Sequence, residues 1–139
     1  MNDVETYEEY ISELIGKDYV VMIAVNQDAG AYLSDEAVSL MHQLGAKGDV
    51  SKAGGKSYLA VLENGTVHAE TSSSDVVAYE NRLYDHRISL ISQGAQAGCY
   101  ASIQFDGVEY APNEKGFNVV VYDPKADMIL SCRSFEIVE

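Results

Sequence analysis

Apolar positions in the first third of the chain recur at helical spacing. Residues three or four apart in the opening segment predict a helix with one buried face, and they are Val4, Tyr7, Ile11 and Leu14. Asn2 or Asp3 is expected to cap this helix, and Gly16 to end it. A second helix is predicted between Ser34, whose hydroxyl can cap it, and Gly45. The pattern therefore predicts two amphipathic helices in this part of the chain.

Most of the remaining chain has the pattern of β-strands. The continuous apolar run 19–25 predicts a strand buried on both faces, and the alternation over 100–105 predicts a strand with one buried face. The other predicted strands are 58–62, 66–71, 82–92, 108–110, 117–122 and 128–138. Asn64-Gly65 predicts a type I′ turn, because both central residues of that turn need positive φ. These elements predict the α+β class, with two helices packed on about seven strands.

Composition and charge narrow the classes of partner. The chain has 139 residues, of which 47% are hydrophobic, and this suits one domain spanning 1–139. Nine Lys and Arg against 22 Asp and Glu give a formal charge of −13. A nucleic-acid binder needs Lys and Arg to replace counterions, and an anionic membrane surface attracts basic segments. We therefore expect neither nucleic acid nor a membrane as a partner.

The sequence also bears on location and on the cysteines. The first fifteen residues are acidic and mixed, without the basic start and apolar run of an export signal. The longest apolar stretch, 19–25, is far shorter than the roughly 20 residues that cross a bilayer. We expect a cytoplasmic or phage-borne protein. Cys99 and Cys132 are too few for a disulfide framework or a zinc site, and both are expected to be buried thiols.

No catalytic motif stands out. The chain has no P-loop, no dinucleotide-binding glycine motif, no nucleophile elbow and no zinc-protease motif. His42 is expected to be a partly exposed helix residue, and nothing in the sequence places His68 or His86 near a serine or cysteine nucleophile. We therefore expect a protein that is not an enzyme and has no cofactor and no metal site.

The ten tyrosines are the more informative excess. A flat amphipathic ring can stack on a sugar or line a protein interface. The alternative is that most of these rings are half-buried with their hydroxyls hydrogen-bonded. Six of them lie in or near predicted strands, namely Tyr58, Tyr79, Tyr84, Tyr100, Tyr110 and Tyr122.

Two parts of the sequence resemble the halves of a known domain. Residues 115–118 read Lys-Gly-Phe-Asn before an apolar strand, and residues 134–136 read Ser-Phe-Glu. Residues 89–139 thereby resemble the first half of the interleukin-like EMT inducer (ILEI, PANDER-like or GG) domain. Residues 1–65 resemble its second half. The reversed order implies a circular permutant, in which Met1 lies near Glu139, or pairing of the halves between two chains.

The resemblance implies a fold and a site. The fold would be a two-sheet β-sandwich-like domain with two flanking helices and no catalytic centre. In the sugar-binding member of the family, an acidic pair after one strand and an Arg-Asp-Ser/Thr-Trp segment line the site. The matching ligand-binding positions here are Gln27, Asp28, Lys56 and Tyr58, which would offer hydrogen bonds and a stacking ring.

These observations lead to three hypotheses about function. The first is a non-catalytic binding module of bacterial or phage origin, for carbohydrate or another small polar ligand. The second is a structural or interaction protein, such as a phage virion component or an oligomeric adaptor, which predicts an apolar patch and a stable homo-oligomer. The third is a protein that sequesters a small ligand in an acidic pocket, or an enzyme of unrecognised type, and it needs a deep cleft.

Overall fold

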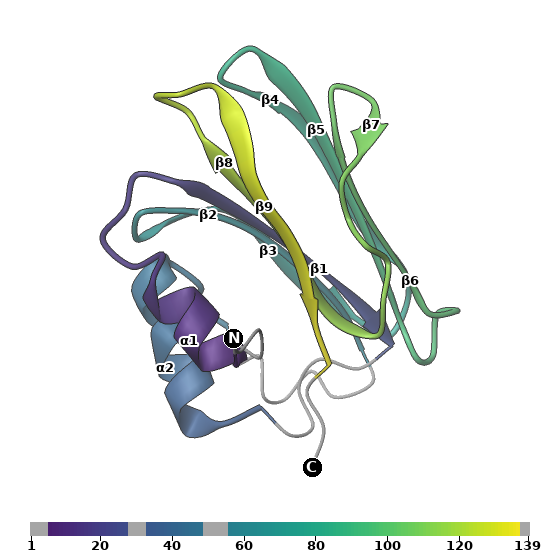
Figure 1. The fold of residues 1–139 in the computed structure, drawn as a ribbon. Coiled ribbons are helices and arrows are strands. Elements are labelled where there is room, and N and C mark those ends of the chain that lie inside the picture. The colour runs from purple at the N-terminus through teal and green to yellow at the C-terminus, as the bar shows by residue number, and fades with distance from the viewer. Residues whose placement is uncertain (1–5, 28–32, 49–55, 137–139) are drawn as a thin grey trace, which may run out of the picture.

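The computed structural model describes residues 6–27, 33–48 and 56–136. The elements in these ranges are α1 (Tyr7–Ser12), β1 (Val20–Gln27), α2 (Asp35–Leu44), β2 (Ser57–Glu63), β3 (Thr66–Ser73), β4 (Val77–Leu83), β5 (His86–Gly94), β6 (Tyr100–Phe105), β7 (Val108–Glu109), β8 (Gly116–Asp123) and β9 (Met128–Phe135). They form three layers (Figure 1): the two helices, a sheet in the order β3-β2-β1-β8-β9, and a sheet in the order β4-β5-β6-β7.

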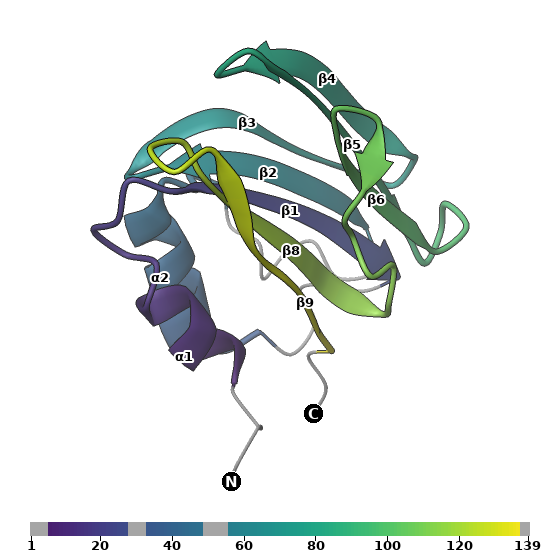
Figure 2. The same ribbon diagram turned by 45° about the horizontal axis from the view of Figure 1, so that its top comes forward.

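Antiparallel pairing builds each sheet, and a short parallel contact joins the two. β1 pairs with β2 on one side and with β8 on the other. Where β2 leaves it, the last two residues of β1, Asn26 and Gln27, pair in parallel with Gln93 and Gly94 of β5. The nine strands are thus connected by hydrogen bonds, and at this bridge they divide into two layers, as Figure 2 shows. The α+β class and the sandwich-like arrangement with two flanking helices are confirmed.

A first core lies between the helices and the first sheet. Alternate residues of β1, β2 and β8 form its floor, and Tyr7, Ile11 and Met41 of the helices cover them. The ring of Tyr7 stacks on Phe117 with 4.6 Å between centroids and lies 5.4 Å from the ring of Phe135. Aromatic pairs of this kind add stability beyond their area burial. The first helix therefore packs on the end of the last strand, whereas Met1 and Glu139 themselves lie outside the described residues.

A second core lies between the two sheets. The other set of alternate residues in the first sheet, Met22 and Val120 among them, meets Leu90 and Ile103 of the second sheet. All four side chains are fully buried. Both faces of β1 are therefore covered, which explains why its sequence is continuously apolar rather than alternating. Burial on both faces, predicted from the run 19–25, is confirmed.

Local chemistry fixes the second helix and the first hairpin as predicted. The Ser34 hydroxyl accepts a hydrogen bond from the Ala37 backbone N–H at 3.0 Å, and the helix ends at Gly45, whose φ is 128°. Asn64 and Gly65 have φ of 44° and 85°, as the predicted type I′ turn requires. The cap, the stop and the turn are confirmed.

The first helix differs from its prediction. Its cap is Thr6, not Asn2 or Asp3, because Thr6 and Glu9 bond reciprocally through backbone and side chain. The helix ends at Ser12 and is followed by a turn that reaches Gly16, whose φ is 79°. The apolar spacing indicated the helix correctly, but a capping box placed further along the chain determines where it begins.

Two further predictions are wrong. The segment 82–92 was expected to be one strand, and it is instead the turn and second half of the β4–β5 hairpin, which reverses at Tyr84 and Asp85. No Gly or Asn marks this turn, so its sequence gave little sign of a reversal. Cys99 and Cys132 are exposed free thiols rather than buried ones. Cys99 lies just before β6, and Cys132 lies on β9, which pairs with β8 alone in the described part of the chain.

Candidate functional site

The tips of three hairpins meet at one end of the sandwich and enclose a recess. The hairpins are β2–β3, β4–β5 and β8–β9, and the segment before β1 joins them. The recess has a volume of about 540 Å³ and is lined by Asp18, Glu63, Asn64, Thr66, Tyr84, Pro124 and Lys125. We call it the hairpin-tip pocket. Loops held by rigid strands are common carriers of binding residues.

Tyr84 is the most unusual residue of this pocket. Its φ is 52°, and that of the next residue, Asp85, is 67°. A left-handed conformation costs an L-residue with a β-carbon roughly 1–2 kcal/mol, and such positions cluster at functional sites. The side chain of Tyr84 is also 49% exposed, unlike most aromatic rings of the chain. The β4–β5 turn thus holds an aromatic ring at the surface in a conformation that Tyr rarely adopts.

Hydrogen bonds fix the direction of this ring. The Tyr84 hydroxyl donates to Oε2 of Glu63, and Oε1 of Glu63 lies 2.8 Å from Nε2 of His68. The bond to Glu63 raises the pKa of the Tyr84 hydroxyl, because a carboxylate acceptor favours the protonated phenol. The ring also lies 6.3 Å from that of Tyr122. Tyr84 is therefore oriented by its neighbours while half of its surface stays open to solvent.

Asp18 connects two of the hairpin tips. Its Oδ1 accepts a hydrogen bond from Nδ2 of Asn64 at 2.7 Å, and its Oδ2 lies 3.5 Å from Nζ of Lys125. The pair with Lys125 is exposed and contributes little stability. It does bring a cation, an amide and a carboxylate to one wall of the pocket.

This arrangement offers the chemistry that a polyhydroxylated ligand needs. An exposed aromatic ring provides an apolar face, and the carboxylates, the amide and the ammonium around it provide hydrogen-bond acceptors and donors. The volume of about 540 Å³ lies in the range of small-molecule sites. The hairpin-tip pocket is therefore the first candidate for a ligand site.

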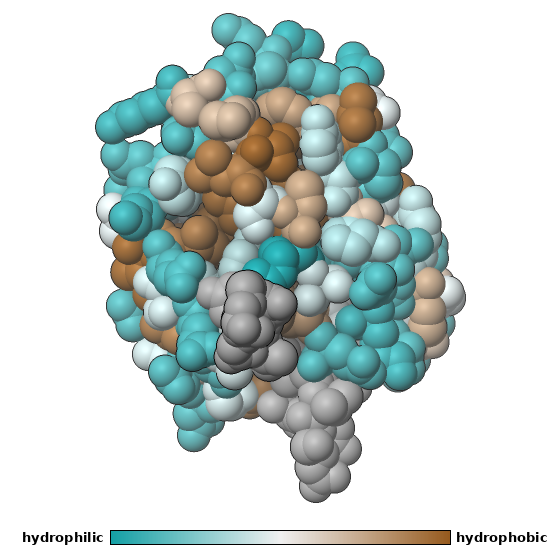
Figure 3. Space-filling view, viewed as in Figure 1, coloured by the Kyte–Doolittle hydropathy of each residue, from teal (hydrophilic) through white to brown (hydrophobic). Residues whose placement is uncertain are grey.

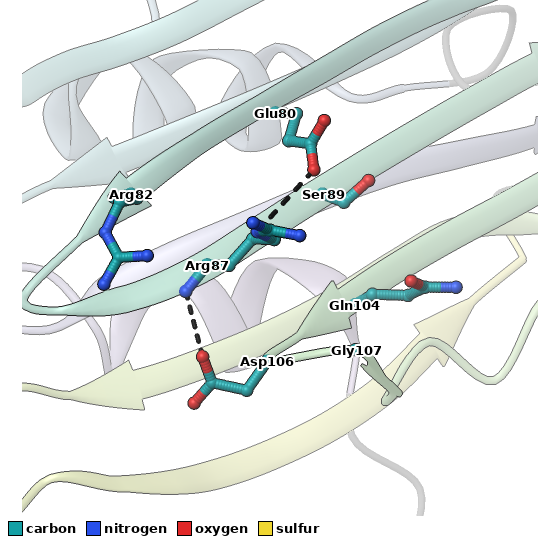
Figure 4. Close-up of a pocket in the computed structure, with 7 residues that line it drawn as sticks. All are labelled: Glu80, Arg82, Arg87, Ser89, Gln104, Asp106 and Gly107. Carbon is teal, nitrogen blue, oxygen red and sulfur yellow. Dashed lines mark hydrogen bonds and ion pairs between the residues drawn. The ribbon is translucent and has the colours of Figure 1, made fainter.

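A second recess lies on the outer face of the second sheet (Figure 4). Its strand residues alternate with side chains of the second core, such as Ile88 and Leu90, and therefore point away from that core. The recess has a volume of about 400 Å³ and is lined by Glu80, Arg82, Arg87, Ser89, Gln104, Asp106 and Gly107. We call it the outer-sheet pocket.

His86 connects the two sheets. Its Nδ1 is 2.6 Å from Oδ2 of Asp106, in the β6–β7 turn, and its Nε2 is 2.6 Å from Oδ1 of Asp127, in the β8–β9 turn. Asp127 also accepts a hydrogen bond from the Tyr122 hydroxyl at 2.6 Å. Hydrogen bonds to Asp106 and then Asp127 raise the pKa of His86, because both carboxylates favour the imidazolium.

The same contacts shift the pKa values of the partners. A backbone N–H from Arg87 and then His86 lower the pKa of Asp106, while Tyr122 and then His86 lower that of Asp127. Burial, followed by the bond to Asp127, raises the pKa of Tyr122 to about 12. The cluster therefore consists of a histidine between two carboxylates that stabilise its protonated form.

The residues predicted as ligand-binding lie elsewhere. Gln27 is half-buried at the end of β1, where its carbonyl accepts a hydrogen bond from the Ala95 N–H at 2.7 Å. Lys56 is exposed just before β2, and Asp28 lies outside the described residues. Gln27 and Lys56 thus lie at the opposite end of β1 and β2 from the hairpin-tip pocket, about 25 Å away for strands of this length.

Tyr58 is not the stacking ring that the resemblance suggested. Its side chain is 2% exposed within the first core, and its hydroxyl donates to Oε2 of Glu70 at 2.7 Å. Burial, and then the charge of Glu70, raise its pKa well above the ordinary value. Tyr58 therefore follows the alternative left open for the tyrosines, a buried ring with its hydroxyl hydrogen-bonded.

Sequence reasoning pointed to the tyrosines but not to Tyr84 in particular. The β4–β5 turn was not predicted, so Tyr84 was placed inside a continuous strand. A Tyr in that position would be an ordinary half-buried ring. The available signal was weak, because Asp85 is of a residue type common in turns but has no Gly beside it.

Three observations complete the description of the site. In the described ranges no group of three or more His, Cys, Asp or Glu residues is placed to hold a metal ion. None of the helices described there is long and apolar enough to cross a membrane. Comparisons of the chain with protein-family models, curated proteins and solved structures found no match.

Proposed function

We propose that this chain is a non-catalytic binding module and that its hairpin-tip pocket binds carbohydrate. The observation that carries the proposal is Tyr84, an aromatic ring held half-exposed at a strained turn position among polar side chains. A sugar presents hydroxyl groups at its edge and C–H groups on its face. The ring would lie against the face, and Asn64 and Lys125 would bond the hydroxyls, while Asp18 holds both of them in place.

The two carboxylates of the pocket support binding rather than catalysis. Glu63 has one oxygen bonded to Tyr84 and the other close to His68. Asp18 has one oxygen bonded to Asn64 and the other near Lys125. A glycosidase needs one carboxylate free to act as acid and another to act as base or nucleophile. Carboxylates whose oxygens are already engaged are better suited to holding the shape of a site.

A glycan array probed with the full chain tests the proposal, followed by titration of the best glycan in solution. Tyr84→Asn removes the ring but suits positive φ, so the turn is retained. We expect this variant to lose about tenfold or more in affinity, since the ring that stacks on the sugar is lost.

The matched control is Tyr100→Asn. Tyr100 is 37% exposed on β6 and lines neither pocket. The Tyr100→Asn variant should bind glycan with unchanged affinity. If no glycan is bound, or if both variants bind as tightly as the original chain, the hairpin-tip pocket is not a carbohydrate site.

A second candidate function is a structural or interaction protein, and the surface of β9 favours it. Met128 and Leu130 are 52% and 43% exposed on this strand. Figure 3 shows hydrophobic side chains gathered in the upper part of the view, where β8 and β9 run in Figure 1. Exposed apolar side chains along a strand with an open edge are typical of association surfaces.

Light scattering separates this candidate from the first. A β9 interface predicts a stable oligomer that Leu130→Lys converts to monomer, while glycan affinity is unaffected. A monomer at all concentrations would contradict it.

A further inference from the structure

The outer-sheet pocket brings together two of the three arginines of the chain. Arg82 of β4 lies directly opposite Arg87 of β5 in the antiparallel register. Side chains at directly opposed positions begin about 5 Å apart at their β-carbons, and like charges there destabilise a sheet. In a chain whose formal charge is −13, two guanidinium groups therefore lie side by side at this position.

Acidic neighbours neutralise the two guanidinium groups only in part. The closest approach of Glu80 to Arg87 is 3.9 Å, and both side chains are 64% exposed, which makes the pair weak. Arg82 donates through Nη2 to the backbone carbonyl of Asp85 at 3.5 Å. Figure 4 shows Arg87 directed toward Glu80, and Arg82 beside it with its guanidinium directed away from Glu80.

Asp106, the other acid of the pocket, has its oxygens committed elsewhere. Its Oδ2 lies 2.6 Å from His86, and its Oδ1 accepts a hydrogen bond from the backbone N–H of Arg87 at 2.9 Å. The side-chain donors of the arginines therefore keep much of their capacity for an outside acceptor. Guanidinium groups bind carboxylates through two parallel hydrogen bonds, more strongly than neutral donors do.

Neutral polar groups complete the floor of the pocket. In register, Ser89 lies opposite Glu80 on one side and Gln104 on the other, two positions along the strands from the arginines and on the same face of the sheet. A hydroxyl and an amide can each donate and accept. They suit the hydroxyl groups of a ligand whose charged end is held by the arginines, and a volume of about 400 Å³ admits one small molecule.

We propose that the outer-sheet pocket is a second ligand site and that it binds the carboxylate of an acidic sugar, with Arg82 and Arg87 holding the charge and Ser89 and Gln104 the hydroxyls. The balance of charge favours a monoanion. Two arginines are offset by Glu80 and Asp106, so a dianion such as phosphate would meet more repulsion than a carboxylate that displaces Glu80 from Arg87.

The test is an NMR titration of the full chain, labelled with nitrogen-15, with sodium glucuronate, glucose and inorganic phosphate. Glucuronate should shift the backbone signals of Ser89 and Gln104 and the side-chain Nε–H signal of Arg87 in a saturable way. Glucose should not shift them, and phosphate should bind more weakly than glucuronate. The glucuronate affinity should also fall as salt is added, because the site is exposed.

Two variants and one control sharpen the result. Arg87→Gln should weaken glucuronate binding about tenfold, as expected for loss of a charge-assisted pair of hydrogen bonds. Arg82→Lys keeps the charge but loses the planar fork, and it should weaken binding to a smaller extent. Lys115→Gln removes the same charge from a half-exposed site outside both pockets and should bind as the original chain does.

The outcome is independent of the hairpin-tip pocket. Tyr84→Asn should leave the glucuronate shifts at Ser89 and Gln104 unchanged, so the two sites can fail separately. Equal shifts with glucose, tighter binding of phosphate, full binding by Arg87→Gln, or an equal loss with Lys115→Gln would each overturn the proposal.

Discussion

At the scale of single residues, His86 forms the main cluster of charged side chains that links the two sheets. It is a histidine between two carboxylates that belong to turns of different sheets. Its side chain is 22% exposed, while those of Asp106 and Asp127 are 49% and 66% exposed. Solvent therefore screens the cluster, and its contribution is better measured than calculated.

The pH dependence of this cluster follows from the direction of its pKa shifts. Folding raises the pKa of His86 above 6.5, so its stabilisation is complete below that pH and is lost as the pH rises through the folded value. Folding lowers the pKa of Asp106 and Asp127 below 3.8, so theirs is lost as the pH falls through the folded values. The cluster should stabilise the fold most between about pH 4 and pH 6.5.

Urea unfolding of the original chain and of His86→Gln checks this. The difference in unfolding free energy between them should be larger at pH 5.5 than at pH 8.5. A difference that is equal at both values, or larger at pH 8.5, would contradict the assignment.

Gly116 illustrates a residue fixed by steric exclusion. Its φ is 103°, and a β-carbon at this position would lie 2.1 Å from the carbonyl oxygen of Phe135 on β9. We expect Gly116→Ala to lower the free energy of unfolding by about 3 kcal/mol or more.

Gly107→Ala is the matched control for Gly116→Ala. It also has positive φ, at 81°, but a β-carbon there meets nothing within 4 Å. It should cost only about 1–2 kcal/mol in the same urea unfolding experiment. Similar losses in the two variants would mean that backbone conformation, not the approach of β9, requires glycine at 116.

At the scale of elements, short helices depend on their caps and on each other. The Ser34 hydroxyl accepts from the first turn of α2 and donates to Oε2 of Glu8 on α1 at 2.6 Å. We expect Ser34→Ala to lower the free energy of unfolding by about 1–2 kcal/mol, because one cap and one charge-assisted hydrogen bond are lost. Urea unfolding measures it, with Ser12→Ala, at the exposed end of α1, as a control of smaller effect.

Elements with a strong local signal were predictable from the sequence, and others were not. The residues that cap and end α2, and those of the Asn64-Gly65 turn, determine these features locally. The continuous apolar run 19–25 likewise predicted that β1 is buried on both faces. The Tyr84 turn carries no such signal, because strand pairing imposes its positive φ. The hairpin-tip pocket could not be predicted for the same reason, since it forms only where that turn meets two other hairpins in space.

At the scale of the whole molecule, the first sheet belongs to both cores. One face of β1 and β8 packs on the helices and the other on the second sheet. Loss of either core therefore exposes a face of the same strands. We expect the described domain to unfold as one cooperative unit.

Phe135→Ala tests this cooperativity. The ring is 8% exposed and contacts Tyr7 and Tyr10 of the first helix. The variant should lose about 3 kcal/mol of unfolding free energy, yet still give coincident urea transitions by tyrosine fluorescence and far-ultraviolet circular dichroism. Met128→Ala, exposed on the same strand, should change stability by less than about 1 kcal/mol. Separate transitions for the two probes would show that the helices and the second sheet are independent.

The bridge between β1 and β5 has a mechanical consequence. In the described part of the chain, the strand pairing that joins the two sheets is confined to Asn26 and Gln27 of β1, which pair with Gln93 and Gly94 of β5. His86 lies seven residues before Gln93 on β5, about 23 Å away. The two sheets are thus joined by strand pairing at one end, at Asn26 and Gln27, and by the His86 hydrogen bonds at the other. If the His86 hydrogen bonds are broken, we expect any relative motion of the two sheets to be largest at the hairpin tips and smallest at Asn26 and Gln27.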